Sequence, residues 1–191
     1  MIYQYEIDKL PVQTGDIICT TDGINAGTDL KGQFWRLLGK LIPGDVDHIA
    51  IYIGPAGRCV EAGARGKVIT FDVREHNWDS RRMLHERGII DTLYGIAYPL
   101  HKIDLTGAEI TKMRESIAEY CLRQASLHKP YNLNFLDSST EDTFYCSQLA
   151  YKAYLRQGID LDTQRGIPEI PGTELIIFPQ EIWSGCYHRR A

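Results

Sequence analysis

The chain has 191 residues, a length that predicts one domain, residues 1–191, with a single hydrophobic core. Its 43% apolar and 24% charged residues exclude collagen-like, coiled-coil and disordered proteins. The 21 basic and 25 acidic residues give a net charge of −4, so no large positive surface is expected for binding nucleic acid.

Five cysteines are too few for a disulfide framework and cannot all pair internally, so we expect free thiols and a reducing compartment. The opening segment MIYQYEIDKLPVQ carries charges and a proline where a signal peptide has an apolar core, and no run of about 18 apolar residues occurs. We therefore expect a cytoplasmic protein without an integral membrane segment. No Cys-x-x-Cys or His-x-x-x-His pair and no phosphate-binding glycine loop occurs, so neither a metal nor a cofactor is expected.

The first expected elements are a strand and a short helix. Gly15-Asp16 predicts a turn that opens a buried strand at Ile17–Cys19. The helical spacing of apolar residues predicts an amphipathic helix over Asp29–Leu41, which ends at Pro43-Gly44.

The next stretch predicts a β-hairpin. Ile alternates with His, Ala and Tyr over His48–Ile53, the segment Gly54–Gly57 forms a turn, and Arg58–Ala62 returns as the second strand. Further strands are expected at Val68–Val73 and within Ile89–Leu100.

Between these last two strands, the charged segment Arg74–Gly88 is expected to be a solvated excursion, with a lid or a binding loop as the alternative. Thr106 and Glu109 then fit a capping box, in which each side chain accepts from the backbone of the other residue. This box predicts the start of an amphipathic helix that reaches about Leu127.

A second helix is expected over Thr143–Gln157, with Asp142 or Thr143 as its cap and Gly158 as its stop. The C-terminal part predicts a strand at Leu175–Phe178 and a helical turn opened by Pro179.

Cys146 is the cysteine whose expected position favours chemistry. It falls in the first turn of the second helix, where free amides and the helix dipole stabilise a thiolate and can hold an oxyanion. A buried structural role is the alternative. The other cysteines lie in expected strands, in mid-helix or near the C-terminus: Cys19, Cys59, Cys121 and Cys186.

A thiol nucleophile requires a base, and the hairpin offers one. If the turn is symmetric about Pro55-Ala56, His48 faces Gly63, and Glu61 lies diagonal to His48 on the same face of the sheet. Glu61 then reaches one imidazole nitrogen and leaves the other for the thiol. A turn of odd length instead moves Glu61 to the opposite face, and the two residues then do not meet. For either turn, the alternative is a structural His48 and a solvent-facing Glu61.

Several of these segments together resemble the NlpC/P60 superfamily of papain-like thiol hydrolases. His48 precedes Cys146 in the chain. This order of the histidine and cysteine segments is similar to that in the circularly permuted branch, which contains the YiiX/YebB-like proteins and the lecithin retinol acyltransferase relatives. The matching segments span residues 15 to 180: Gly15–Ile18, Asp47–Gly54, Val60–Ala62, Lys129–Asn132, Phe144–Leu149 and Phe178–Gln180.

The resemblance implies that Cys146 is the nucleophile, His48 the general base and then acid, and Glu61 the group that orients His48. It also implies that the Cys146 amide contributes to the oxyanion hole. Tyr145 and Tyr131 are implied substrate-binding residues, with core packing as the alternative for Tyr145.

The chain departs from the pattern at two positions. Tyr145 replaces the aspartate that usually precedes the cysteine in unpermuted relatives, and Asn132 stands where YiiX-like chains often have aspartate. We expect both departures to affect the substrate pocket rather than the thiol chemistry.

These observations predict an α+β, permuted papain-like fold in which helices pack on one side of an antiparallel sheet. The expected function is hydrolysis of an amide bond, in a peptide or an amino-acid conjugate, through a thioester on Cys146. One alternative keeps the triad and acts on an acyl lipid as an acyltransferase or thioesterase, which an apolar acyl channel or a membrane anchor would favour. The other is a binding module that no longer catalyses.

Overall fold

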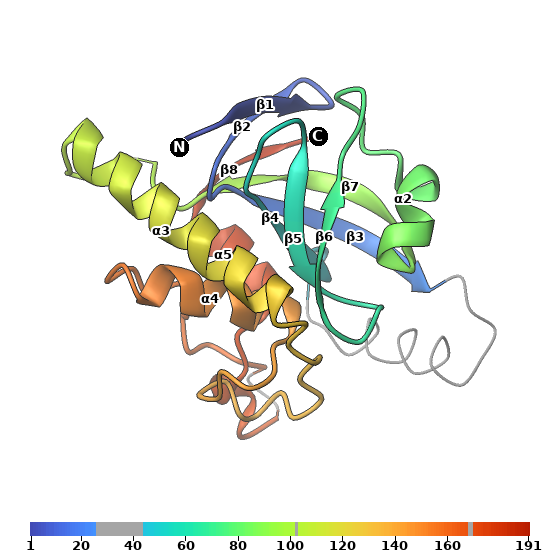
Figure 1. The fold of residues 1–191 in the computed structure, drawn as a ribbon. Coiled ribbons are helices and arrows are strands. Elements are labelled where there is room, and N and C mark those ends of the chain that lie inside the picture. The colour runs from blue at the N-terminus through green and yellow to red at the C-terminus, as the bar shows by residue number, and fades with distance from the viewer. Residues whose placement is uncertain (26–43, 102, 168–169) are drawn as a thin grey trace.

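The computed structural model describes residues 1–25, 44–101, 103–167 and 170–191, and the helix predicted over Asp29–Leu41 lies outside these ranges (Figure 1). The described strands form a six-stranded antiparallel sheet in the order β6-β5-β4-β3-β7-β8, in which β4 and β5 are largely apolar and β8 is polar and exposed. Its strands are β3 Ile17–Asn25, β4 His48–Tyr52, β5 Arg58–Ala62, β6 Val68–Asp72, β7 Ile89–Tyr98 and β8 Tyr187–Arg190. The strands predicted in the regions of β3 to β7 are therefore confirmed.

A separate two-stranded sheet and several helices complete the described fold. The small sheet consists of β1 Gln4–Ile7 and β2 Leu10–Gln13. The helices are α2 Ser80–Arg87, α3 Gly107–Ser126, α4 Cys146–Leu155 and α5 Pro179–Gly185, with a 3-10 turn η1 at Thr173–Leu175. The result is a mixed α+β fold.

Every residue of β4 is buried, so both faces of the central sheet are covered at this strand. Ile49 belongs to a cluster with Ile117 of α3 and Leu149 of α4, on the face that α3, α4 and α5 cover (Figure 1). Tyr52 packs on the other face, in a cluster that contains Met83 of α2 and residues of the β1–β2 hairpin. The prediction that the helices lie on one side is therefore wrong for α2.

The register of the β4–β5 hairpin agrees with the prediction. Ile51 pairs with Val60 and Tyr52 with Cys59, which is the arrangement expected for a turn symmetric about Pro55-Ala56. The alternating pattern of β4 and β5 therefore places His48 and Glu61 on the same face of the sheet.

The predicted cap of α3 is present. Thr106 Oγ1 accepts from the Glu109 amide at 3.3 Å, and Glu109 Oε2 accepts from the Thr106 amide at 2.8 Å. The helix runs to Ser126, with Leu127 as its C-cap. The capping-box signal thus predicted the start of this helix correctly.

Two predictions for other segments are wrong. The segment Arg74–Gly88 contains α2 and is not a solvated excursion, because its Arg87 side chain is fully buried among carboxylates and aromatic rings. No strand forms at Leu175–Phe178, where the Ile177 amide donates to the Tyr145 hydroxyl instead of to a neighbouring strand. The helical turn opened by Pro179 is confirmed as α5.

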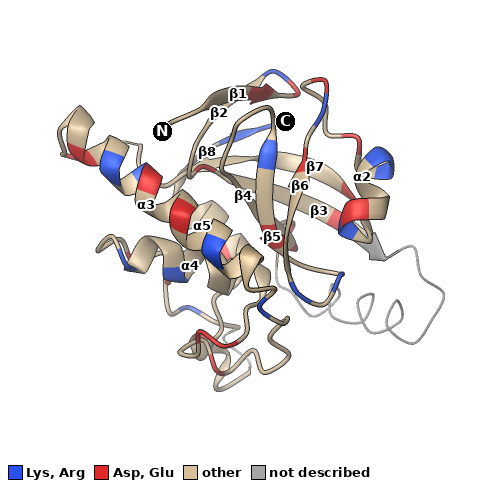
Figure 2. Ribbon diagram, viewed as in Figure 1, with Lys and Arg blue, Asp and Glu red and all other residues tan. Residues whose placement is uncertain are grey.

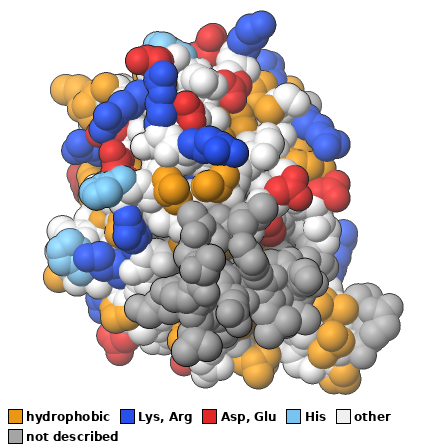
Figure 3. Space-filling view, turned by 90° about the vertical axis from the view of Figure 1, so that its right-hand side faces the viewer, with side chains coloured by type: hydrophobic (Ala, Val, Ile, Leu, Met, Phe, Trp, Pro, Cys, Tyr) orange, Lys and Arg blue, Asp and Glu red, His pale blue; other side chains and the backbone are white. Residues whose placement is uncertain are grey.

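Charged side chains of both signs are interspersed over the described surface. Acidic and basic residues both occur along α3 (Figure 2), and they are intermixed on the face that Figure 3 presents. Within the described ranges, no helix combines the length and the apolar character that crossing a bilayer requires.

Candidate active site

Cys146 is the first residue of α4 because the chain before it is held in an extended form. The Phe144 amide donates to Pro130 O and the Asn132 amide to Phe144 O, both at 3.0 Å. The helix cap is the Gln148 side chain, whose Oε1 accepts from the Tyr145 amide at 3.2 Å. The predicted start near Thr143, with a cap at Asp142 or Thr143, is therefore wrong. Cys146 lies at the helix terminus, where the first-turn amides have no intrahelical carbonyl partner.

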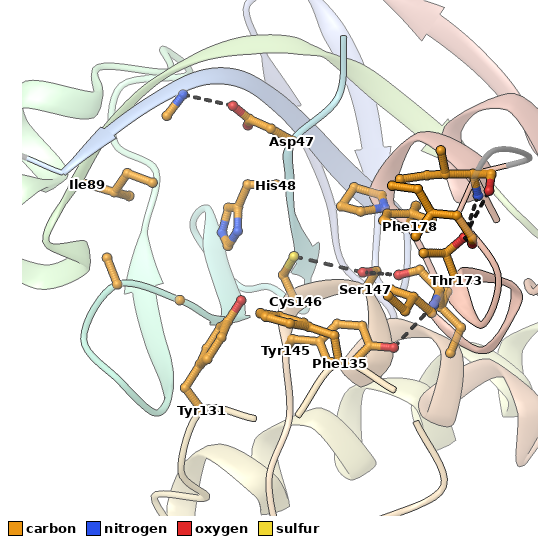
Figure 4. A pocket seen from close by; sticks show the side chains of 18 residues that line it. Asp47, His48, Ile89, Tyr131, Phe135, Tyr145, Cys146, Ser147, Thr173 and Phe178 are labelled. Carbon is orange, nitrogen blue, oxygen red and sulfur yellow. Dashed lines mark hydrogen bonds between the residues drawn. The ribbon is translucent and has the colours of Figure 1, made fainter. Parts of the chain in front are cut away.

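The five cysteines, all free thiols, differ in their surroundings. Burial raises the pKa of Cys19 and Cys59 well above the ordinary value, that of Cys121 to about 12 and that of Cys186 to about 11. Cys146 instead lines a cavity and stands beside a histidine (Figure 4). Among the five thiols, Cys146 thus combines access to a cavity with a neighbouring base.

His48 and Glu61 form a buried hydrogen-bonded pair. His48 Nε2 lies 2.9 Å from Glu61 Oε2, and Glu61 is fully buried. Gly63 permits this approach, because a Cβ on Gly63 would lie 3.3 Å from Glu61 Oε1 and 3.4 Å from His48 Cε1. The bond occupies Nε2, which leaves Nδ1 as the nitrogen available to Cys146.

The charges around His48 favour the imidazolium. Burial opposes a positive charge on His48, but the interactions with Cys146 and Glu61 outweigh it and hold the pKa of His48 well above its ordinary value. Burial also opposes the charge of Glu61, and here Arg87 and His48 outweigh it and lower the pKa of Glu61. The structure thus brings the three predicted residues Cys146, His48 and Glu61 together.

Arg87 connects Glu61 to a second buried carboxylate. Its side chain is fully buried, and its Nη2 lies 2.8 Å from both Glu61 Oε2 and Asp91 Oδ2. The guanidinium carbon lies 4.7 Å from the ring centroids of both Phe71 and Trp78. These two rings and two carboxylates fix Arg87 in place.

Asp91 is in turn held by neighbouring donors. Its Oδ1 accepts from Ser80 Oγ at 2.8 Å and from Trp78 Nε1 at 3.1 Å. When His48 is protonated, its charge and those of Glu61, Arg87 and Asp91 alternate in sign and cancel. This arrangement stabilises the imidazolium form of His48.

Sequence reasoning missed Arg87 because it assigned the whole segment Arg74–Gly88 to solvent, and it gave no role to Asp91 in the strand that follows. A glutamate in a buried strand nevertheless requires a cationic partner. Arg87 lies four residues before Asp91, an acidic residue within an apolar strand, and this pair of buried charges is the signal that was available.

Cys146 and His48 both line a cavity of about 290 Å³. Figure 4 shows the Cys146 sulfur beside the imidazole, with aromatic side chains around it. Two hydroxyl side chains that line the cavity, Ser147 and Thr173, donate to backbone carbonyls within the protein. The other lining side chains are largely apolar or aromatic and include Ala64, Ile89, Phe135, Ile170, Ile177 and Phe178.

The two predicted substrate-binding tyrosines line this cavity. The Tyr145 hydroxyl accepts from the Ile177 amide at 3.2 Å, so Tyr145 both packs the structure and presents its ring to the cavity. The Tyr131 hydroxyl points toward His48 and Cys146 (Figure 4). Burial is the main cause that raises the pKa of Tyr131 well above its ordinary value, and the interaction with Cys146 is the second.

Asn132, which we expected to affect the pocket, supports the helix start instead. Its Nδ2 donates to Gln148 Oε1 and to Asp137 O, both at 3.0 Å. Its amide oxygen accepts from the Asn134 backbone at 2.9 Å. The side chain is therefore fully used in fixing the loop and the capping glutamine of α4.

No protein-family model matches the sequence, and no curated protein matches it. The fold is similar to a crystal structure described as the metalloprotein yiiX from Escherichia coli O157:H7, DUF1105. The two chains share 16% identity with a TM-score of 0.54, over 93% of this chain and 95% of that one. At this identity the likeness concerns the fold alone, and it agrees with the YiiX-like fold that the motifs indicate.

Glu61→Gln is expected to lower the pKa of His48, because it removes a neighbouring negative charge and a strong acceptor. In the wild type, protonation of His48 stabilises the native state. This stabilisation is complete at pH values below the pKa of His48 in the unfolded chain, and it is lost as the pH rises through the higher pKa of His48 in the folded protein. Titration of labelled histidine by NMR measures the change. Asp72→Asn, which removes the partner of surface Arg58, is the control and leaves the His48 titration unchanged. An unaltered titration in Glu61→Gln contradicts the role given to Glu61.

Proposed function

We propose that the chain is a thiol hydrolase of the permuted papain-like, NlpC/P60 type that cleaves an amide bond through a thioester on Cys146. The observation that supports this best is the meeting of Cys146, the His48–Glu61 pair and the start of α4 at one cavity. The motif resemblance gives the same three residues the same roles. The apolar lining favours an amide whose acyl part is apolar.

In the proposed acylation step, the Cys146 thiolate attacks the carbonyl carbon. The amides at the start of α4 stabilise the oxyanion, and the helix dipole adds to this effect. The His48 imidazolium then donates its proton to the leaving nitrogen, the C–N bond breaks, and a thioester remains. Glu61 keeps the ring oriented through Nε2 during this transfer.

Hydrolysis of the thioester requires His48 to act as a base. Cys146 is one of the groups that raise the pKa of His48, and acylation removes the thiolate charge. The pKa of His48 therefore falls in the acyl-enzyme, and the neutral imidazole takes a proton from water as that water attacks the thioester. Departure of the Cys146 thiolate releases the carboxylic acid and restores the starting state.

Transfer of the acyl group to an amine or a lipid is the second candidate. The apolar cavity beside Cys146 favours it, because the same lining that suits an apolar acyl chain also excludes water. The chemistry up to the thioester is identical, so the two candidates differ only in the acceptor.

The fold neighbour is described as a metalloprotein, so the fit of a metal to this chain matters. A protein metal site such as that of zinc uses three or four His, Cys or carboxylate ligands. In the ranges that the structure describes, no group of three or more such residues is arranged to hold a metal ion, and Arg87 already pairs with Glu61. The described residues do not fit a metal, and no step is assigned to one.

Turnover of simple amides tests the proposal. The octanoyl amide and the acetyl amide of pentylamine are each incubated with the protein, and the pentylamine released from each is quantified. We expect release from the octanoyl compound, an octanoyl adduct on Cys146 by intact mass, and at least a 100-fold loss of release in Cys146→Ala. Octanoate as the product indicates hydrolysis, and an octanoylated added amine indicates transfer.

Cys186→Ala is the matched control, because Cys186 is a half-buried thiol outside the cavity lining. It is expected to retain wild-type turnover. Release of pentylamine by Cys146→Ala at the wild-type rate contradicts the proposal, and so does an absence of both turnover and adduct in the wild type.

A further inference from the structure

The cavity contains one carboxylate that the proposed chemistry does not use. Asp47 Oδ2 accepts from the Gly23 amide at 3.0 Å, whereas Asp47 Oδ1 is buried and has no hydrogen-bond partner among the described residues. Leaving a buried carboxylate oxygen without a donor is costly. Burial accordingly raises the pKa of Asp47 despite the Gly23 bond and the nearby His48.

Asp47 stands on a distinct part of the cavity wall. Figure 4 shows it on the side of His48 that faces away from Tyr131. Gly23 and Ile89 lie next to it, since a Cβ on Gly23 would be 3.6 Å from Asp47 Oδ2 and 3.1 Å from Ile89 Cδ1. This side of the cavity therefore combines an apolar side chain with one unpaired carboxylate.

The proposed reaction assigns the leaving group to the same side. His48 donates its proton to the leaving nitrogen, so that nitrogen must lie against the imidazole. The acyl part then extends along the opposite, aromatic wall that contains Tyr145 and Phe178. Whatever substituent the leaving amine carries is therefore directed toward Ile89 and Asp47.

We propose that Asp47 binds a positively charged group on the leaving amine, so that the preferred substrate is an apolar acyl amide of an alkyl diamine. The ammonium supplies the donor that Asp47 Oδ1 lacks, and the alkyl linker contacts Ile89. The same carboxylate repels a leaving group that carries a free carboxylate, as the C-terminal residue of a peptide does. This inference rests on the proposed amide hydrolysis and specifies its substrate class.

Three octanoyl amides that differ only at the distal end of the leaving amine test the inference. They are the monoamide of 1,5-diaminopentane, the pentylamide and the amide of 6-aminohexanoate. We expect kcat/KM of the wild type to be roughly 10- to 100-fold higher for the diamine than for the pentylamide, and lowest for the aminohexanoate. In Asp47→Asn this preference disappears, while turnover of the neutral pentylamide changes by less than about threefold.

The asparagine retains an acceptor for the Gly23 amide, so the fold around it is preserved. Asp45→Asn is the matched control, because Asp45 is exposed and its carboxylate accepts from Tyr94 instead of lining the cavity. It is expected to leave the order of the three substrates unchanged. An equal loss of all three substrates in Asp47→Asn, or a wild type without preference for the diamine, overturns the inference.

Binding to the inactive protein separates this inference from the proposed function. Calorimetry with Cys146→Ala is expected to show the diamine amide binding more tightly than the pentylamide, and the Cys146→Ala/Asp47→Asn double variant to remove the difference. Tighter binding of the diamine amide without turnover by the wild type contradicts only the proposed hydrolase function. Turnover without the diamine preference contradicts only the role of Asp47, and the absence of binding and turnover contradicts both.

Discussion

Replacing Arg87 with methionine is expected to lower the free energy of unfolding by about 3 to 5 kcal/mol. The change leaves Glu61 and Asp91 buried without their shared cation, and it removes the guanidinium that packs against Phe71 and Trp78. Methionine retains most of the side-chain volume, so the lost charge accounts for most of the effect. Urea unfolding followed by circular dichroism measures the difference.

Arg58→Met is the control for this measurement. Arg58 forms an ion pair with Asp72 at the surface, and its removal is expected to cost less than about 1 kcal/mol. Asp91→Asn provides a milder test if the Arg87 variant does not fold, because asparagine retains an acceptor for Ser80. A cost of less than about 1 kcal/mol for both Arg87→Met and Asp91→Asn contradicts the buried network as described.

His48→Ala is expected to lower the turnover of an octanoyl amide by about 10²- to 10⁴-fold, because it removes both the proton donor and the base. It also removes a charge that balances the buried carboxylates, since His48 contacts Glu61 directly. The measured quantity is kcat/KM for release of the amine at neutral pH. Thermal unfolding of the same sample separates a loss of chemistry from a loss of fold.

His85→Ala is the matched control, because His85 is exposed on α2 and is expected to leave turnover unchanged. A folded His48→Ala variant with turnover within about threefold of the wild type excludes His48 as the acid and base.

The hairpin and the reactive side chains were predictable because local rules govern them. The symmetric turn around Pro55-Ala56 fixed the register, and the register alone placed Glu61 beside His48. The position of Cys146 at the start of a helix followed from apolar periodicity, although the helix starts about three residues later than predicted. The helix starts later because the backbone of Phe144 pairs with the 130–132 segment instead of entering the helix.

The supporting charges were not predictable from local patterns. Arg87 lies in a strongly polar segment, and only the tertiary fold reveals that its side chain turns inward to Glu61 and Asp91. Burial of α2 against the sheet likewise depends on contacts with β6 and β7 that local periodicity does not encode. The unpaired oxygen of Asp47 is also a property of the assembled cavity.

Residue-resolved alkylation of the five thiols in the native protein tests most directly whether Cys146 is the activated nucleophile. The native protein is treated with iodoacetamide at neutral pH, and labelling at each cysteine is followed by mass spectrometry. We expect Cys146 to react at least about tenfold faster than Cys19, Cys59, Cys121 and Cys186, and His48→Ala to remove this advantage. Equal labelling of all five thiols, or a Cys146 rate unaffected by His48→Ala, contradicts the account.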